Sequence, residues 1–216
     1  PVVLGEELKD GDRIVTGRAS FVVFSTGGAD VARIQPESDV VLTSIADMSK
    51  IDLGLDRGSV LSRVNKLAKG AGYRVTTSTV VAFVRGTIFS VNTDEGTGAV
   101  AVKTGTVRVA VKNSGKSLDV TGGAAVLFTG DLAERPIEDA ESIILENMES
   151  LPADLNADAG ERPEEINRQI IEKDREINRK LEDKGIPRTL EDIKARYERI
   201  DEVTLYSGRV IRGIIM

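Results

Sequence analysis

Residues 79–91 form a run of mostly apolar and β-branched residues, with one charge at Arg85 and one glycine at Gly86. Such residues favour extended structure, so the run predicts a strand. Residues 80–84 are apolar without a break, which is typical of a strand that is buried on both faces. Gly86 lies where a bend would let the strand leave one sheet and join another.

Short apolar segments separated by turn residues continue on both sides of this run. Before it, strands are expected near residues 13–16, 20–24, 31–34 and 39–43. The glycine pair at residues 27–28 predicts a hairpin turn. After the run, valines alternate with polar or small residues around residues 104–105, which predicts an antiparallel hairpin with one buried face. Further turns are expected at residues 113–116 and 122–123.

Two segments resemble each other, at residues 55–61 and 102–108. Each has an apolar residue, two polar residues, a glycine, a serine or threonine, and a valine. We interpret each as a tight turn that joins two strands. Short strands at this spacing predict a mainly β fold, which is a β-sandwich, a jelly roll or a curved antiparallel sheet.

The pattern changes near residue 131 from short strands to charged helices. Periodic apolar residues predict helices near residues 136–151, 164–184 and 189–200. The second helix has a narrow apolar stripe that resembles a short coiled-coil seam, formed by Ile166, Ile170, Ile177 and Leu181.

The last residues, 201–216, predict a β-hairpin around a Ser-Gly pair. A two-stranded hairpin is marginal alone, so we expect it to dock on a sheet edge of this chain or of a second copy in a homodimer. The chain thus divides into a β-domain (residues 1–130), an acidic helical arm (131–200) and this hairpin.

Three ordered motifs resemble the FecR domain family. Residues 84–91 read Val-Arg-Gly-Thr-Ile-Phe-Ser-Val, and Thr79 and Ala82 precede them as in the signature of that family. Residues 8–17 resemble the family's opening, and residues 33–38 resemble its Ile-x-Pro-x-Ser motif.

The resemblance covers about residues 4–130, and it departs from the family where a Thr-Pro pair is replaced by Thr79-Val80. It implies a periplasmic or surface β-domain, of the kind found in transmembrane regulators of sigma factors and in other envelope proteins. The start at Pro1 and the lack of a long apolar run lead us to expect a mature or trimmed product with no transmembrane segment in these residues. Such a start is compatible with a signal or lipid anchor that has been removed.

Composition excludes several kinds of chemistry. The chain has no His and no Cys, which removes histidine bases, thiol nucleophiles, disulfides and the usual zinc ligands. The glycine cluster at residues 69–72 lacks the Gly-Lys-Ser/Thr ending of a phosphate loop. Acidic pairs lack the spacing of a glycosidase or a calcium site. We therefore expect no enzyme activity, no cofactor and no metal site.

Charge is distributed unevenly along the chain. Residues 131–202 hold 22 acidic and 12 basic residues, which gives 12 − 22 = −10, whereas residues 57–93 carry only basic charges. This basic stretch is either an ordinary solvated surface or a docking site for the acidic arm or an acidic partner. The candidate partner-binding residues are Arg63, Lys66, Arg74 and Arg85.

Arg85 has two interpretations, because an isolated charge cannot stay buried in a core strand. It pairs with a core carboxylate or caps a carbonyl, or else it is presented to a partner. Nucleic acid is not expected as that partner, since the pI is about 5.0 and aromatics are not interleaved with the basic residues.

The sequence therefore predicts a non-enzymatic interaction or scaffold module of the bacterial cell envelope, periplasmic or lipid-anchored, with an unidentified protein partner. One alternative is the extracytoplasmic sensor part of a sigma-factor regulator, although the membrane helix and cytoplasmic segment of such regulators do not occur in these residues. Another is cell-wall glycan binding, which the absence of Trp and the presence of only three Tyr disfavour.

Overall fold

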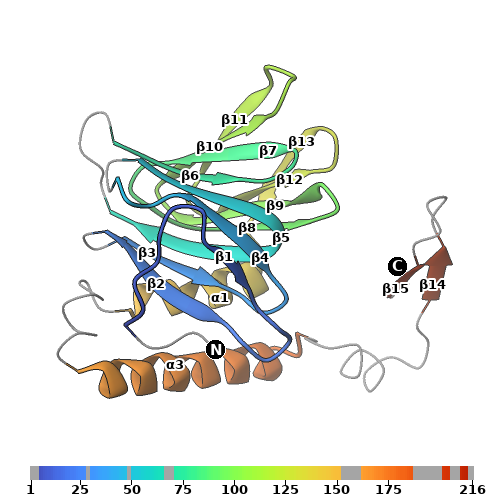
Figure 1. Cartoon of the computed structure of the whole chain (residues 1–216). Coiled ribbons are helices and arrows are strands. Elements are labelled where there is room, and N and C mark those ends of the chain that lie inside the picture. The colour runs from blue at the N-terminus through green and yellow to red at the C-terminus, as the bar shows by residue number, and fades with distance from the viewer. Residues whose placement is uncertain are drawn as a thin grey trace.

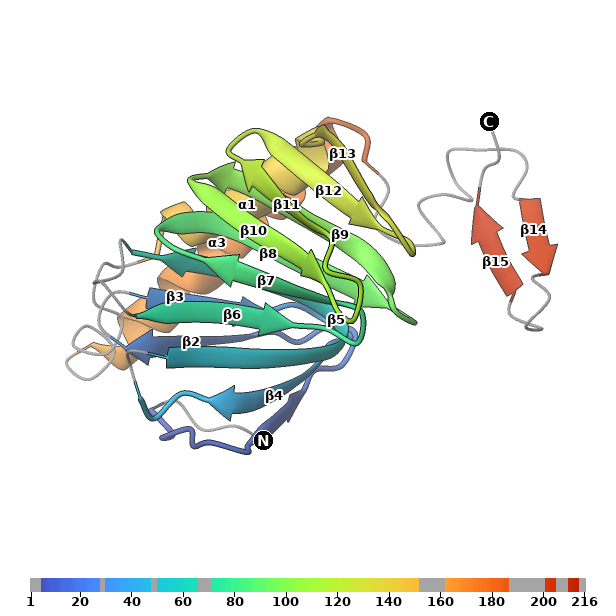
Figure 2. The ribbon, with the colours of Figure 1, turned by 90° about the horizontal axis from the view of Figure 1, so that it is seen from above.

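The computed structural model describes residues 5–27, 30–47, 50–65, 71–151, 162–186, 201–204 and 210–213. Thirteen strands form one continuous sheet, which folds over into two facing layers, and helices follow it along the chain (Figures 1 and 2). The predicted mainly β fold is confirmed, in the form of one large sheet that curves over on itself.

The two layers share the long strand β5 (Lys50–Val64). The first layer, sheet I, has the order β1 (Arg13–Val15), β4 (Asp39–Ser44), β5, β6 (Gly72–Thr76), β7 (Val80–Val84), β10 (Thr106–Val111) and β11 (Ser117–Thr121). The second layer, sheet II, has the order β2 (Val22–Gly27), β3 (Asp30–Ile34), β5, β8 (Thr87–Asp94), β9 (Thr97–Thr104), β12 (Ala124–Phe128) and β13 (Leu132–Pro136). Neighbours are antiparallel except β5 and β6.

Glycines mark the corners where the chain passes from one layer to the other. Gly86 lies between β7 and β8, Gly105 between β9 and β10, and Gly123 between β11 and β12. Their φ angles are 74°, 85° and 87°, a region that residues with a Cβ rarely adopt. The predicted change of sheet at Gly86 is confirmed.

Gly105 is also the point of closest approach between two corners. A Cβ atom built on it would lie 2.4 Å from the carbonyl oxygen of Gly86. On its other side, the backbone N–H of Gly122 donates to the carbonyl oxygen of Gly105 at 2.9 Å. Three neighbouring bends are therefore stacked so closely that no side chain fits at the middle one.

Two sequence-based interpretations are wrong at these bends. β9 and β10 do not form a hairpin, because β9 pairs with β8 and β12 whereas β10 pairs with β7 and β11. Residues 55–61 do not form a turn between two strands but a bend within β5 at Gly58, where φ is 93°. A glycine turn and a glycine corner share one sequence pattern, and only the partner strands distinguish them.

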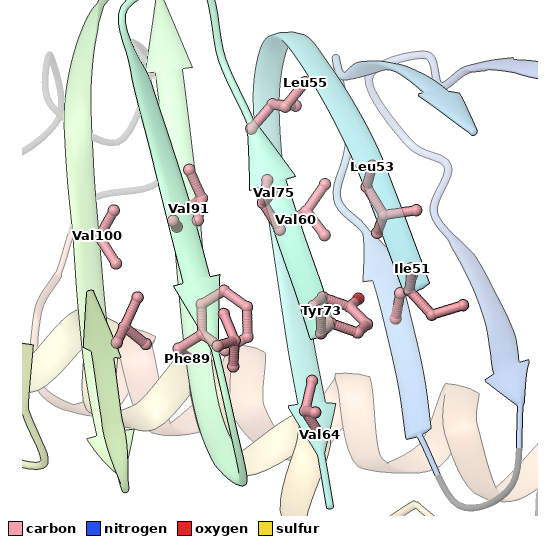
Figure 3. Close-up of a cluster of buried hydrophobic side chains, with 14 of the residues drawn as sticks. Ile51, Leu53, Leu55, Val60, Val64, Tyr73, Val75, Phe89, Val91 and Val100 are labelled. Carbon is pink, nitrogen blue, oxygen red and sulfur yellow. The ribbon is translucent and has the colours of Figure 1, made fainter. Parts of the chain in front are cut away.

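Apolar side chains from both layers fill the space between them (Figure 3). Tyr73 of sheet I meets Phe89 of sheet II edge to face, with ring centroids 6.2 Å apart. The Tyr73 hydroxyl lies 2.9 Å from Ser62 Oγ, so its polar end is satisfied inside the core. Burial raises the pKa of Tyr73, so this hydroxyl stays protonated.

Within residues 79–91, it is β8 that is covered on both faces, rather than the predicted residues 80–84. In β7, Phe83 is 42% exposed, so only one face of that strand is buried. In β8, Phe89 and Val91 face the core between the layers, while Ile88 packs in the cluster beneath the helices. The difference arises because helices cover sheet II and leave β7 in sheet I open.

Helices α1 (Asp139–Glu149) and α3 (Pro163–Asp183) pack on the outer face of sheet II. Ile166 of α3 joins Leu145 and Met148 of α1 in an apolar cluster with strand residues. The predicted seam continues with Ile177 and Leu181, which pack against α1. The stripe that resembles a coiled coil is therefore buried within this chain, and neither described helix has the length and apolar composition needed to cross a bilayer.

A buried arginine joins α3 to sheet II. Arg33 of β3 is 4% exposed in its side chain and donates Nη2 to Asp174 of α3. Its Nε donates to Gln35 Oε1 at 3.1 Å, and its guanidinium lies 3.8 Å from the centroid of the Phe21 ring. Because the cation is out of water, its partners must stay in place, and this fixes the position of the helix.

The predicted C-terminal hairpin is present as β14 (Asp201–Thr204) and β15 (Val210–Gly213), which pair antiparallel in a sheet of their own. Docking of this hairpin on a sheet edge and the homodimer stay predictions, as does the division into domains. The third predicted helix, at residues 189–200, lies outside the described residues.

We expect Gly105→Ala to lower the free energy of unfolding by about 3 kcal/mol, because it combines an unfavourable φ with a collision against backbone. Gly115→Ala is the matched control, since Gly115 has a φ of 70° and nothing within 4 Å of the added atom. Gly115→Ala should lower the free energy of unfolding by only about 1 kcal/mol. Equal losses in urea denaturation would contradict a special role for the Gly105 corner.

Asp174→Asn should destabilise the packing of α3 by about 2 kcal/mol, because it removes the negative charge of Asp174 from the buried cation of Arg33. Hydrogen exchange should show faster opening of α3 in this variant. Glu172→Gln, an exposed position on the same helix, is the control. If both variants exchange like the parent chain, the ion pair does not hold the helix.

Candidate interaction surface

The outer face of sheet I carries a row of side chains that crosses five strands. Arg74 of β6 lies opposite Phe83 of β7, and Phe83 lies opposite Arg108 of β10. Asp52 of β5 lies opposite Arg74, and Asp119 of β11 lies opposite Arg108. The row therefore reads Asp, Arg, Phe, Arg, Asp, and we call these five residues the ladder.

Each arginine of the ladder is bound by its outer aspartate. Arg108 donates Nε to Asp119 Oδ1 at 2.7 Å and Nη2 to Oδ2 at 2.8 Å. Arg74 donates Nη2 to Asp52 Oδ2 at 2.7 Å, and Asp52 Oδ1 accepts from Thr76 Oγ1 at 2.9 Å. Hydrogen bonds from Arg108 hold the pKa of Asp119 below its ordinary value, so this carboxylate is ionised at neutral pH.

The ladder borders an open depression of about 960 Å³. Its charged lining residues are four basic ones and one acidic one, namely Lys50, Arg74, Arg85, Arg108 and Asp119. Both described helices pack on sheet II, so neither covers this face. Within the described residues, no group of three or more acidic side chains is placed to hold a metal ion. The chemistry available here is ion pairing and apolar contact.

Two of the four predicted contact residues lie at this depression, Arg74 and Arg85. Arg85 is not inside a core strand as expected, because it occupies the corner between β7 and β8 and its side chain is exposed. Lys66 lies outside the described residues.

The fourth predicted residue, Arg63, lies on the other side of the sandwich beneath α1. Its Nη1 donates to the carbonyl oxygens of Met148 and Leu151, at 3.0 and 2.6 Å, where α1 ends. A cation at a helix C-terminus is favourable, since unpaired carbonyl oxygens gather there. The helical arm thus docks on part of the basic stretch, and Arg63 is a structural residue rather than a surface contact.

Sequence reasoning missed Phe83, Arg108 and the two aspartates of the ladder. The signal for Arg108 is local, because it stands between Val107 and Val109 and both valines are buried. Alternation therefore places Arg108 on the outer face of its strand. Its position beside Phe83 depends on the pairing of β7 with β10, which strand periodicity does not specify.

Residues 12–108 match the FecR protein family. The match confirms the resemblance suggested by the sequence motifs for these residues, a shorter range than residues 4–130. It contains Asp52, Arg74, Phe83 and Arg108 and ends before Asp119. No curated protein matches the chain.

Two crystal structures of a candidate anti-sigma factor from Parabacteroides distasonis resemble the chain, each with a TM-score of 0.51 and 15% sequence identity. The similarity covers 59% of this chain and 60% of that protein, so it spans less than two thirds of its length. At this identity it shows a shared fold.

Replacing Arg108 by Gln should raise the pKa of Asp119 toward its ordinary value, because the hydrogen bonds that favour the carboxylate are lost. The pair stabilises the fold above the unfolded-state pKa, and its contribution is lost as the pH falls through the lowered folded-state pKa. Carboxyl-carbon NMR titration measures the shift.

Arg13→Gln is the matched control, since Arg13 binds Asp39 with the same Nε and Nη2 pattern, at 2.7 and 2.6 Å, on β1 and β4. It should raise the pKa of Asp39, which is held low by Arg13, and leave that of Asp119 unchanged. An unmoved Asp119 pKa in Arg108→Gln would show that the pair is not formed in solution.

Proposed function

We infer that this chain, whose residues 12–108 belong to the FecR family, is a protein-binding module of the bacterial cell envelope and that it acts without catalysis. The observation that carries this inference is the ladder, in which an exposed aromatic ring stands between two arginines on the face of sheet I that neither described helix covers. The family supports a location in the cell envelope, and the surface supports binding.

The residue types of the ladder favour a protein partner. Aromatic residues and arginine are enriched in the cores of protein–protein interfaces and among the residues that dominate their affinity. Phe83 offers apolar area, while Arg74 and Arg108 offer fixed hydrogen-bond donors beside it. The depression is open and broad rather than enclosed, which suits another protein surface better than a small substrate.

The side chains available here do not favour catalysis. With no His and no Cys in the chain, a general acid or base at neutral pH would have to be a carboxyl group with a raised pKa, or a lysine or tyrosine with a lowered one. The pKa of Asp119 is lowered instead, and Asp52 is bound to Arg74 and Thr76. Both carboxylates act as supports for the arginines.

A sensor role in a sigma-factor regulator is the more specific candidate. The fold shared with a candidate anti-sigma factor and the FecR family both support it. A glycan-binding role has less support, because Tyr73 is the one tyrosine within the described residues and it is 1% exposed. No described tyrosine is therefore placed to stack on a sugar.

A photo-crosslinking amino acid at position 83, introduced in living cells of the source bacterium, should form adducts with an envelope protein. The same amino acid at Val15 is the control, because Val15 is 64% exposed on β1 of the same sheet and does not line the depression. Mass spectrometry of the adduct would distinguish a signalling partner from a structural one. If position 83 yields no protein adduct, or yields the same adducts as position 15, this face does not bind a protein.

A further inference from the structure

We propose that the ladder binds an acidic segment of the partner protein, in which an apolar side chain that covers Phe83 is flanked by carboxylates that pair with Arg74 and Arg108. This inference rests on the proposed protein-binding function and specifies the chemistry of the partner. Its basis is the alternation of fixed cations and an exposed aromatic ring along one row of the sheet.

The charge of this surface is opposite to that of the whole chain. The full sequence has a net charge of −6, yet the depression is lined by four basic residues and Asp119. Adding Asp52, which binds Arg74 from outside the lining, still leaves 4 − 2 = +2. A local positive surface on an acidic protein attracts an acidic partner and disfavours a basic one.

The aspartates of the ladder orient the arginines without using all their donors. Asp119 accepts from Nε and Nη2 of Arg108, and Asp52 accepts from Nη2 of Arg74. A guanidinium has five N–H donors. The bonds just described do not include Nη1 of either arginine. Both arginine side chains remain substantially exposed, at 62% for Arg108 and 49% for Arg74. Because the arginine side chains are already ordered, less of their conformational entropy is lost when a partner carboxylate pairs with them.

Phe83 distinguishes a protein segment from a simple anion. It stands at the centre of the ladder with its side chain exposed, and an anion alone would leave that ring in water. The backbone of β6, β7 and β10 is paired within the sheet, so this face has no row of free N–H groups to hold a phosphate. An occupant with both carboxylates and an apolar side chain satisfies the whole row.

The partner chemistry can be tested with two synthetic peptides that differ only in charge. One peptide has a central leucine flanked on both sides by glutamates, and the other has glutamines in their place. Titrated against the full chain at low salt, the glutamate peptide should bind at least about tenfold more tightly, and salt should weaken its binding. The Arg74→Gln/Arg108→Gln double variant should lose this preference, and Phe83→Ser should weaken binding of the acidic peptide.

Arg13→Gln is the matched control, because it removes an equivalent arginine–aspartate pair from the same sheet at a position that does not line the depression. It should bind the acidic peptide like the parent chain, and matched melting temperatures would show that the double variant is folded.

Equal binding of the two peptides, or equal losses in Arg13→Gln and the double variant, would overturn the inference. Binding of inorganic phosphate or a single-stranded oligonucleotide that depends on both arginines but not on Phe83 would also overturn it, in favour of a simple anion site. If position 83 crosslinks to a protein while the chain binds the acidic peptide no more tightly than the neutral one, the proposed function stands and the inference of an acidic partner is wrong. If no protein crosslinks while the peptide preference holds, the proposed function fails instead.

Discussion

The architecture depends on a close backbone approach, that of Gly105 to the carbonyl oxygen of Gly86. A Cβ atom at Gly105 would come within 2.4 Å of that oxygen, so adjacent long segments of the chain can bend at the same place only if the middle one has no side chain. Stacked bends turn one antiparallel meander into two facing layers, and the apolar side chains of both layers are then buried between them. The two layers therefore do not have to associate as separate sheets, because each long segment contributes a strand to both layers.

The helices then make the two outer faces different. Sheet II is covered by α1 and α3 through an apolar cluster, through Arg63 at the end of α1, and through the buried ion pair of Arg33 with Asp174. Sheet I keeps its outer face free of the described helices. One outer face is thus buried beneath the helices, and the described helices leave the other exposed, which agrees with the proposed role as an interaction module.

The side chains of the ladder are ordered by ion pairs and still exposed to solvent. Its arginines are held by aspartates on neighbouring strands, so the positive groups are ordered before any partner arrives. Exposed ion pairs add little to folding stability, and a patch of this kind is therefore more informative about recognition than about the fold. The same arrangement of Arg13 with Asp39 on the far strands of sheet I lacks an aromatic neighbour in its row, because Arg13 lies opposite Val41.

Much of this structure was determined locally by the sequence. Alternating valines marked the strands, the run at residues 79–91 marked a change of sheet at Gly86, and apolar periodicity marked α1 and α3 to within a few residues. These features follow from neighbours along the chain, because the pleat of a strand and the turn of a helix are short-range properties. The tertiary structure alone decided that β9 and β10 belong to different layers, that Arg63 supports a helix while Arg74 faces outward, and that Arg74, Phe83 and Arg108 share one row. Those facts depend on which strands pair and in which register, and pairing between distant segments is set by the packing of the whole core rather than by any one stretch of residues.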